Sequence, residues 1–382
     1  MQENQKNIWW LGLVSFINDT ASDMILPILP LFVKDIGGTG LAIGMISGLG
    51  ESIASLFKMF AGFLSDKLGR RKPFVFAGYS ISSFCKFLFT YAKVWPQVLV
   101  LRSFERLGKG IRSAPRDAIL AASTEQKTRG RGFGIHRAMD SGGSVLGSIV
   151  TLILFWSFNF SFRNIFLIAG IISFISLIPL VFVKERGVEQ KTMSLRFGIK
   201  SLPKSLKLFM AIATLFALGN FSYMFFVLKS QPYFTGRLAV GIPIILYIIY
   251  NISYTFFAVP SGLLSDKIGR KSVLFMGYGL FGLVCFGFIF SKSIVVLIIL
   301  FLFFGLNYAL VEANERAFVS DMAPESIRGT ALGTFHMLIS LVALPGGLIA
   351  GYLWDLNTTY TFVFGAIISL IVITSFSILK TK

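Results

Sequence analysis

The chain has 382 residues, of which 54% are hydrophobic and only 14% are charged. A soluble domain carries about a quarter charged residues, so this composition excludes a soluble globular protein. The formal net charge of +18 would suit nucleic acid or an anionic membrane surface, and the placement of the basic residues decides between them.

Hydropathy predicts twelve membrane-spanning helices. Each apolar run has about 20 residues or more, which suits a helix that crosses a bilayer. The alternating strands of a β-barrel are absent, so the expected fold class is an all-α polytopic membrane protein. The predicted spans are residues 8–33, 41–63, 73–93, 96–118, 132–155, 163–183, 207–229, 239–262, 273–291, 293–317, 329–352 and 358–379.

The basic residues gather on one side of the predicted membrane. The loops after the second and eighth spans and the segment 184–206 are rich in lysine and arginine, whereas the opposite loops hold few. This positive-inside bias predicts a multi-pass protein of the plasma (inner) membrane with both termini cytoplasmic. It also argues against nucleic acid as a partner.

The first span carries acidic residues near mid-bilayer. Asp19 and Asp23 are four residues apart and share one helix face, next to Asn18. Two carboxylates this close in a low dielectric do not both ionise easily, so one is expected to carry a proton. The alternative is a static ion pair with Arg106 or Lys109.

The second span holds Glu51 near its midpoint and Lys58 on the same face. A structural ion pair and a role with substrate are equally compatible with this spacing. The span ends in the phrase GFLSDKLGRR, which begins at Gly62.

The fourth span has an unusual density of charge. Its ionisable residues recur every three or four positions, so they form one stripe that must face the protein interior or a water-filled cavity. They are Arg102, Glu105, Arg106, Lys109, Arg112 and Arg116.

The fifth span begins GFGIHRAMDSGG. We expect His136 at the helix mouth to be a hydrogen-bonded spectator, whereas Asp140 lies deeper and is a candidate for function. The second half of the chain carries little charge and many aromatic residues. Asn220, Tyr250, Asn307 and Glu312 are its candidate substrate contacts, with simple packing of the aromatic residues as the alternative.

A charged phrase occurs twice. GFLSDKLGRR begins at Gly62 and GLLSDKIGRK begins at Gly262, 200 residues later and also between an even and an odd span. A repeat on this scale predicts two parallel six-helix halves. The expected domains are residues 1–183 and 207–382, joined by a cytoplasmic linker at 184–206.

These two phrases resemble the loop motif of the major facilitator superfamily, and the twelve-span plan extends the resemblance over the whole chain. The nearest characterised relatives that it suggests are drug–proton antiporters. Arg102 and Gly108 match the family pattern R-x-x-Q-G-x-G, while Glu105 and Arg106 depart from it. Gly134, Gly143 and Gly147 resemble part of the antiporter motif, with Ser148 where proline is expected.

The resemblance implies a gate built on the loop motif. Gly62 and Gly69 would permit close approach and a tight turn, Asp66 would face the start of the eleventh span near Thr330, and Arg70 would pair with Asp117. Asp266 and Arg270, with Gly262 and Gly269, would act likewise in the second half. Arg71 and Lys72 are expected only to hold the loop in the cytoplasm.

The resemblance and the intramembrane charges together predict a proton-coupled secondary transporter that exports a small amphipathic or anionic solute by alternating access. Its partners would be that solute, protons and the lipid bilayer, and it would act as a monomer without a cofactor. The motifs of ATP hydrolysis, metalloproteases and hydrolases are absent, so an enzyme is not expected.

The candidate residues fall into three groups. Proton coupling is assigned to Asp19, Asp23 and Arg102. Substrate binding is assigned to Asn18, Glu51, Glu105, Arg106, Lys109, Asp140, Asn220, Tyr250, Asn307 and Glu312. The alternatives left open are cation-selective multidrug efflux, an uncoupled uniporter or exchanger, and a membrane sensor.

Overall fold

The computed structural model describes residues 3–124, 129–185, 202–324 and 327–378, and all regular structure in these ranges is helical. Residues 186–201, most of the predicted linker 184–206, lie outside the described residues. Contacts between residues group the chain into two compact units. Unit 1 comprises residues 1–37 and 53–195, and unit 2 comprises residues 38–52 and 196–382.

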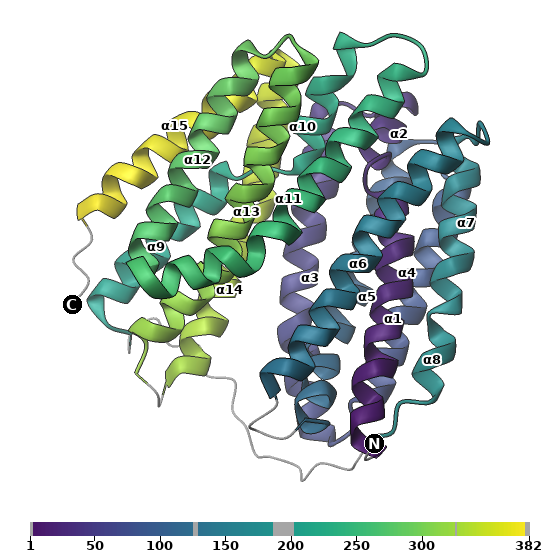
Figure 1. The fold of residues 1–382 in the computed structure, drawn as a ribbon, viewed down its shortest axis with the longest axis vertical. Coiled ribbons are helices and arrows are strands. Elements are labelled where there is room, and N and C mark those ends of the chain that lie inside the picture. Colours follow the sequence, from purple (N-terminus) through teal and green to yellow (C-terminus); the bar gives the residue numbers. More distant parts are fainter. Residues whose placement is uncertain (1–2, 125–128, 186–201, 325–326, 379–382) are drawn as a thin grey trace. The chain divides into compact units, whose positions relative to one another are not determined.

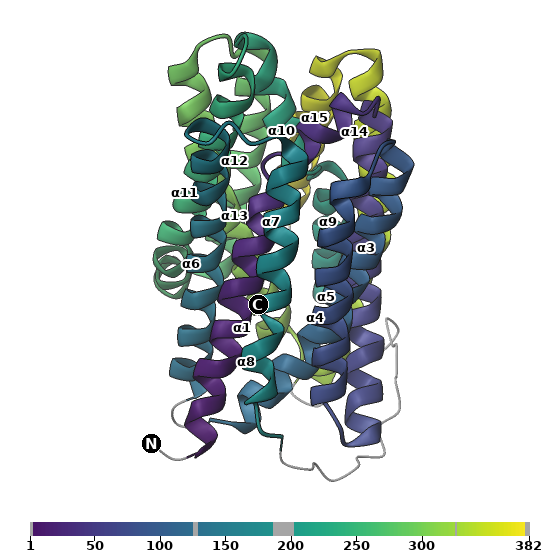
Figure 2. The same cartoon turned by 90° about the vertical axis from the view of Figure 1, so that its right-hand side faces the viewer.

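The helices of each unit run side by side along one direction (Figures 1 and 2). Those that begin in the first half of the chain are α1 (Glu3–Ile25), α2 (Leu29–Asp35), α3 (Gly40–Leu68), α4 (Lys72–Leu88), the 3₁₀ turn η1 (Phe89–Tyr91), α5 (Trp95–Ala122), α6 (Arg129–Trp156), α7 (Phe162–Ile175) and α8 (Leu177–Val181). Those of the second half are α9 (Lys204–Gly219), α10 (Tyr223–Ser230), η3 (Gln231–Tyr233), α11 (Leu238–Ile268), α12 (Arg270–Phe290), α13 (Ile294–Met322), α14 (Arg328–Leu356) and α15 (Thr358–Ile378).

The prediction of twelve spans is confirmed, although three of them are broken. The first span is α1 followed by α2, because Pro27 and Pro30 interrupt the helix. The sixth span is α7 and α8. The seventh is α9 and α10, with a break at Asn220, whose backbone leaves the helical region at ψ 71°.

Ten helical stretches of the described residues are long and apolar enough to cross a membrane by themselves. The two remaining spans fall short for separate reasons. α4 has only 17 residues, and α5 carries the charged stripe that begins at Arg102. Both still pack closely within unit 1, which buries Lys86 of α4 and Arg102, Glu105 and Arg112 of α5.

Small residues bring α6 against α1 in unit 1. A side chain at Gly143 would collide with the backbone of Phe16, and one at Gly147 would collide with the backbone of Thr20. Hydroxyls of α6 reinforce the contact, since Thr151 donates to the Met24 carbonyl at 2.8 Å. This close approach determines which face of α1 packs against which face of α6.

Aromatic packing builds the core of unit 2. Phe226 of α10 stacks on Phe304 of α13 with ring centroids 4.2 Å apart, and it meets Phe288 edge to face at 5.0 Å. Large apolar side chains also cover the outside. Phe256 is 69% exposed and Leu283 is 67% exposed, as expected for a surface that faces lipid.

Candidate functional site

Two acidic side chains meet inside unit 1. Asp19 lies on α1 and Asp140 on α6, and their carboxyl groups lie close enough to interact. Two carboxyl groups this close in a low dielectric do not both ionise easily, because the two negative charges repel. Arg137 lies 3.4 Å from Asp140 on the same helix. The two acids and Arg137 thus form a cluster of ionisable groups between α1 and α6.

Asp23 is the acidic neighbour that the sequence places beside Asp19, and the structure adds the carboxyl group of Asp140 from α6. Lys86, Lys109 and Arg112 are charges close to Asp19, and the Asn18 amide donates to it. The glycine contact between α1 and α6 brings Asp140 within reach of Asp19. Asp23 is buried at 7% exposure, and its backbone carbonyl accepts a hydrogen bond from Ser148 at 3.4 Å.

A buried lysine beside this pair was missed from the sequence. Lys86 of α4 is 1% exposed. Its ammonium group donates to the Asn18 side-chain oxygen at 2.8 Å, to the Asn18 backbone carbonyl at 3.2 Å and to the Ser173 hydroxyl at 3.3 Å. The signal was a lone lysine inside an apolar span, which marks function by default.

The charged stripe of α5 faces into unit 1 over much of its length. Arg102 and Glu105 form a buried ion pair of 2.7 Å. Arg112 is 3% exposed, donates to Ser82 at 2.7 Å and lies over the ring of Tyr79. Arg106 is half-buried and Lys109 is exposed on the same helix. The prediction that the stripe faces the interior therefore holds for its buried members.

Asp117 pairs with Arg116 instead of the expected Arg70. Nε and Nη2 of Arg116 lie 3.2 and 3.0 Å from the Asp117 carboxylate, and Nη1 reaches Ser15 at 2.9 Å. Arg116 is the sequence neighbour of Asp117 and is already held over it by Ser15. The expected Arg70–Asp117 pair is therefore absent from this conformation of the described residues.

The first loop motif forms an ion pair between Asp66 and Arg71. Gly69 has φ of +64°, a left-handed conformation that glycine adopts without strain. The turn places the Arg71 guanidinium 2.7 Å from Asp66. The expectation that Arg71 only holds the loop in the cytoplasm is therefore incomplete, because Arg71 is a partner of Asp66.

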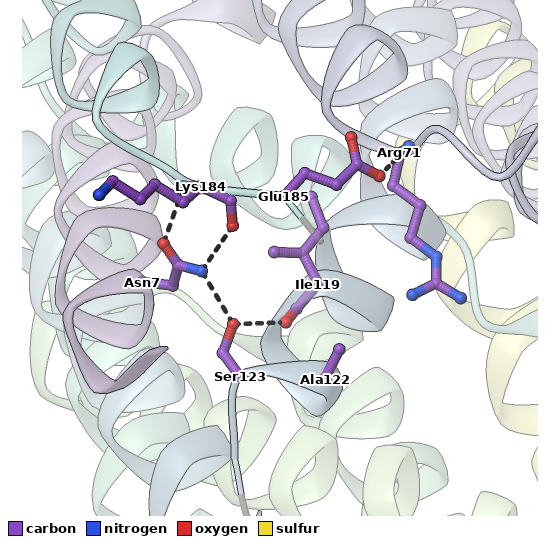
Figure 3. Close-up of a pocket in the computed structure, with 7 residues that line it drawn as sticks. All are labelled: Asn7, Arg71, Ile119, Ala122, Ser123, Lys184 and Glu185. Carbon is purple, nitrogen blue, oxygen red and sulfur yellow. Dashed lines mark hydrogen bonds between the residues drawn. The ribbon is translucent and has the colours of Figure 1, made fainter. Parts of the chain in front are cut away.

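A pocket lies beside Arg71 in unit 1 (Figure 3). The Asn7 amide donates to the Lys184 carbonyl at 2.8 Å and to Ser123 at 3.1 Å. The Glu185 carboxylate accepts from the backbone N–H groups of Arg71 and Lys72 and so caps α4. The pocket is lined by Asn7, Arg71, Ile119, Ala122, Ser123, Lys184 and Glu185.

The second loop motif has a similar turn and different partners. Gly269 has φ of +89°, and Arg270 bridges Asp266 at 2.9 Å and Asp321 at 3.1 Å. The first glycines of the motifs differ as well. A side chain at Gly62 would touch Ala114, whereas Gly262 has open space around it.

Tyrosines gather around Tyr250 in unit 2. Its ring lies 5.8 Å from Tyr247 and 5.6 Å from Tyr308, and it stacks on Phe304 at 5.0 Å. At the margin of this tyrosine cluster, the Tyr254 hydroxyl donates to Glu312 at 2.5 Å.

The other predicted contacts of the second half are scattered. Asn307 is turned to α12, where it donates to the Gly277 carbonyl at 2.8 Å, so it has a structural role. The Asn220 side-chain oxygen is buried without a hydrogen-bond partner among the described residues. Glu51 lies on α3 in the part that belongs to unit 2. No group of acidic, histidine or cysteine side chains in the described ranges is arranged to hold a metal ion.

Almost the whole sequence matches a known family. Residues 11–244 and 210–381 match the family described as Major Facilitator Superfamily. The chain belongs to the major facilitator superfamily. It is therefore a secondary transporter in the membrane that binds a small-molecule substrate, and it is not an enzyme.

Relatives by sequence are transporters too. The chain is 47% identical to an uncharacterized MFS-type transporter of Methanocaldococcus jannaschii, over 97% of this chain and 94% of the relative. It is 22% identical to the multidrug resistance protein MdtH of Aeromonas salmonicida, over 91% of this chain and 87% of the relative.

Solved structures share the fold. The nucleoside transporter NupG aligns over 100% of both chains with a TM-score of 0.79 and 17% identity. The POT family transporter PepTSo aligns over 98% of this chain and 97% of its own with a TM-score of 0.77 and 12% identity. At these identities the likeness establishes the fold alone.

Proposed function

We propose that this transporter couples the movement of protons to the export of a small amphipathic solute by alternating access. The Asp19–Asp140 carboxyl pair carries the proposal, because a shared proton between two intramembrane acids is what a proton carrier needs. Loss of that proton leaves two like charges beside Lys109 and Arg112, which favours a change of conformation.

The substrate contacts proposed in unit 1 are cationic. Arg106 and Lys109 on α5 lie in the charged stripe and would hold the anionic group of the solute. Arg102 is occupied by its buried ion pair with Glu105, so we assign it a supporting role in proton coupling. Asp66, Arg71 and the Gly69 turn in unit 1, with Asp266 and Arg270 in unit 2, are the proposed gating groups.

The tyrosine cluster of unit 2 would bind the apolar body of the solute. Aromatic faces bury large area at low cost in side-chain entropy. The basic loops support a protein of the plasma membrane with both termini on the cytoplasmic side. The proposed working unit is one chain.

A second candidate is cation-selective multidrug efflux. The Glu312 carboxylate lies beside Tyr254 and pairs with Arg316 at 2.7 Å, so an organic cation that displaced Arg316 would lie next to aromatic rings. The name of the relative MdtH points in the same direction.

The test is transport by purified protein in liposomes with an imposed pH gradient. Tetraphenylphosphonium, a zwitterionic aromatic amino acid and an aromatic carboxylate would be offered in turn, each radiolabelled. We expect one class to accumulate against its gradient and to be released when a protonophore is added. Movement of a solute that is unaffected by the pH gradient and the protonophore would contradict proton coupling.

A further inference from the structure

Lys86 is a charge that the proposed function leaves without a role. It lies on α4 and is 1% exposed. An ionisable group inside a membrane span costs free energy, so it is expected to have hydrogen-bonding partners and a function.

The three donors of the Lys86 ammonium group are matched by three acceptors. They are the backbone carbonyl and side-chain oxygen of Asn18 and the hydroxyl of Ser173, at 3.2, 2.8 and 3.3 Å. An ammonium group only donates, so the Asn18 side chain must present its oxygen to Lys86. The hydrogen bond therefore fixes which way the Asn18 amide points.

The fixed amide reaches the proton site. With its oxygen held by Lys86, the Asn18 nitrogen donates to the Asp19 carboxylate at 3.1 Å. Ser173 also donates to the Asn18 oxygen, at 3.3 Å, and so supports the same orientation. A continuous hydrogen-bonded path thus runs from Lys86 through Asn18 to Asp19, and the Asp19 carboxyl lies beside that of Asp140.

The charges on and around this path come from four helices, α1, α4, α5 and α6. Lys86 faces Asp19 of α1 and Arg102, Glu105 and Arg112 of α5, while α7 contributes the Ser173 hydroxyl. Asp19 faces Asp140 of α6 in addition to Lys109 and Arg112 of α5. The Asn18 amide therefore links Lys86 to Asp19, and its hydrogen bond to Lys86 fixes its orientation.

We propose that Lys86 is a positioning residue for the proton site: through Asn18 it fixes the hydrogen bond that Asp19 accepts, and its charge sets the pH at which the Asp19–Asp140 pair takes up a proton. This inference rests on the proposed function, because it assumes that the pair is the proton carrier. It adds a residue on α4 to a site built from α1 and α6.

The test needs no substrate. The full-length protein in detergent is titrated while infrared difference spectroscopy follows the band of protonated carboxyl groups. The contribution of Asp19 is the part of the band that Asp19→Asn removes. Lys86→Met should move the midpoint of that contribution to higher pH by about one unit or more, because loss of a nearby positive charge favours the neutral acid.

Three further variants separate charge, hydrogen bond and packing. Lys86→Arg keeps the charge and should keep the midpoint close to that of the wild type. Asn18→Leu keeps Lys86 but breaks the path, and it should move the midpoint in the same direction as Lys86→Met. Ser103→Ala is the control, since the Ser103 hydroxyl donates to the Leu99 carbonyl within α5 and lies outside the path, and it should leave the midpoint unchanged.

If Lys86→Met does not elute as a single species in size-exclusion chromatography, the midpoint of Asn18→Leu alone tests whether the path to Asp19 matters. An Asp19 contribution that keeps the wild-type midpoint in both Lys86→Met and Asn18→Leu would overturn the role of Lys86 and leave the proton site intact. A wild-type titration without any Asp19 contribution would overturn the proposed proton site, and the role of Lys86 with it.

Discussion

The carboxylate of Asp66 lies 2.7 Å from the guanidinium of Arg71, across the turn at Gly69. The second copy of the motif uses Arg270 instead, at 2.9 Å from Asp266. The side chains of the first pair are 34% and 14% exposed, whereas Asp266 is 62% exposed. The two copies of one sequence motif thus differ in how well their ion pairs are shielded from water.

This difference predicts unequal effects of equivalent substitutions. Asp66→Asn should lower the free energy of unfolding by about 1 kcal/mol, and Asp266→Asn by less than about 0.5 kcal/mol, because exposed ion pairs are screened. Denaturant unfolding of the purified variants would measure both. Equal losses would show that the shielding of the first pair has no energetic consequence.

The contact between α1 and α6 can be tested with one methyl group. Gly147→Ala places a Cβ against the backbone of Thr20, and such overpacking costs about 1–3 kcal/mol. Gly134→Ala on the same helix is the matched control, since Gly134 has no atom within 4 Å of the new methyl group. We expect a lower midpoint of thermal unfolding for the first variant and an unchanged or higher one for the second.

Glu185 should stabilise unit 1 by capping α4. Its two carboxylate oxygens accept from the N–H groups of Arg71 and Lys72, where the helix dipole favours an anion. Glu185→Ala should cost about 1 kcal/mol, and Glu185→Gln, which keeps one acceptor oxygen, should cost less. Unfolding of the graded pair by denaturant tests this order, and a Gln variant as unstable as the Ala variant would contradict it.

Substitutions in the tyrosine cluster should show whether it binds the apolar body of the solute or an organic cation. Tyr250→Leu removes stacking worth about 1 kcal/mol or somewhat more, so KM for the exported solute should rise about tenfold. Tyr254→Phe keeps the ring and loses only the hydrogen bond to Glu312. A change in KM for Tyr254→Phe with tetraphenylphosphonium, and none with an aromatic carboxylate, would favour cation efflux.

Most of the fold is predictable from the sequence. Apolar runs of spanning length predict the helices, and the repeated phrase at Gly62 and Gly262 predicts the family. The broken spans are harder to predict, because hydropathy does not reflect backbone conformation. The backbone leaves the helix at Asn220, and the next helix begins three residues later. Prolines mark the other two breaks, with Pro27 between α1 and α2 and Pro179 in the first turn of α8.

The candidate site is predictable residue by residue but not pair by pair. Spacing alone places the buried ion pair Arg102–Glu105 on one face of α5. It cannot pair Asp19 with Asp140, because that depends on how α1 and α6 are rotated about their axes, which the contacts of Gly143 and Gly147 decide. Lys86 could have been found, since a lysine in an apolar span is itself a signal.

Proton movement in liposomes tests the central claim most directly. The purified protein is enclosed with a pH-sensitive dye, and the solute found to be transported is added outside. We predict a change of internal pH that Asp19→Asn and Asp140→Asn each reduce to the level of empty liposomes, while Gly134→Ala retains it. Coupled proton movement that persists in both acid variants would contradict the assignment of the proton to this pair.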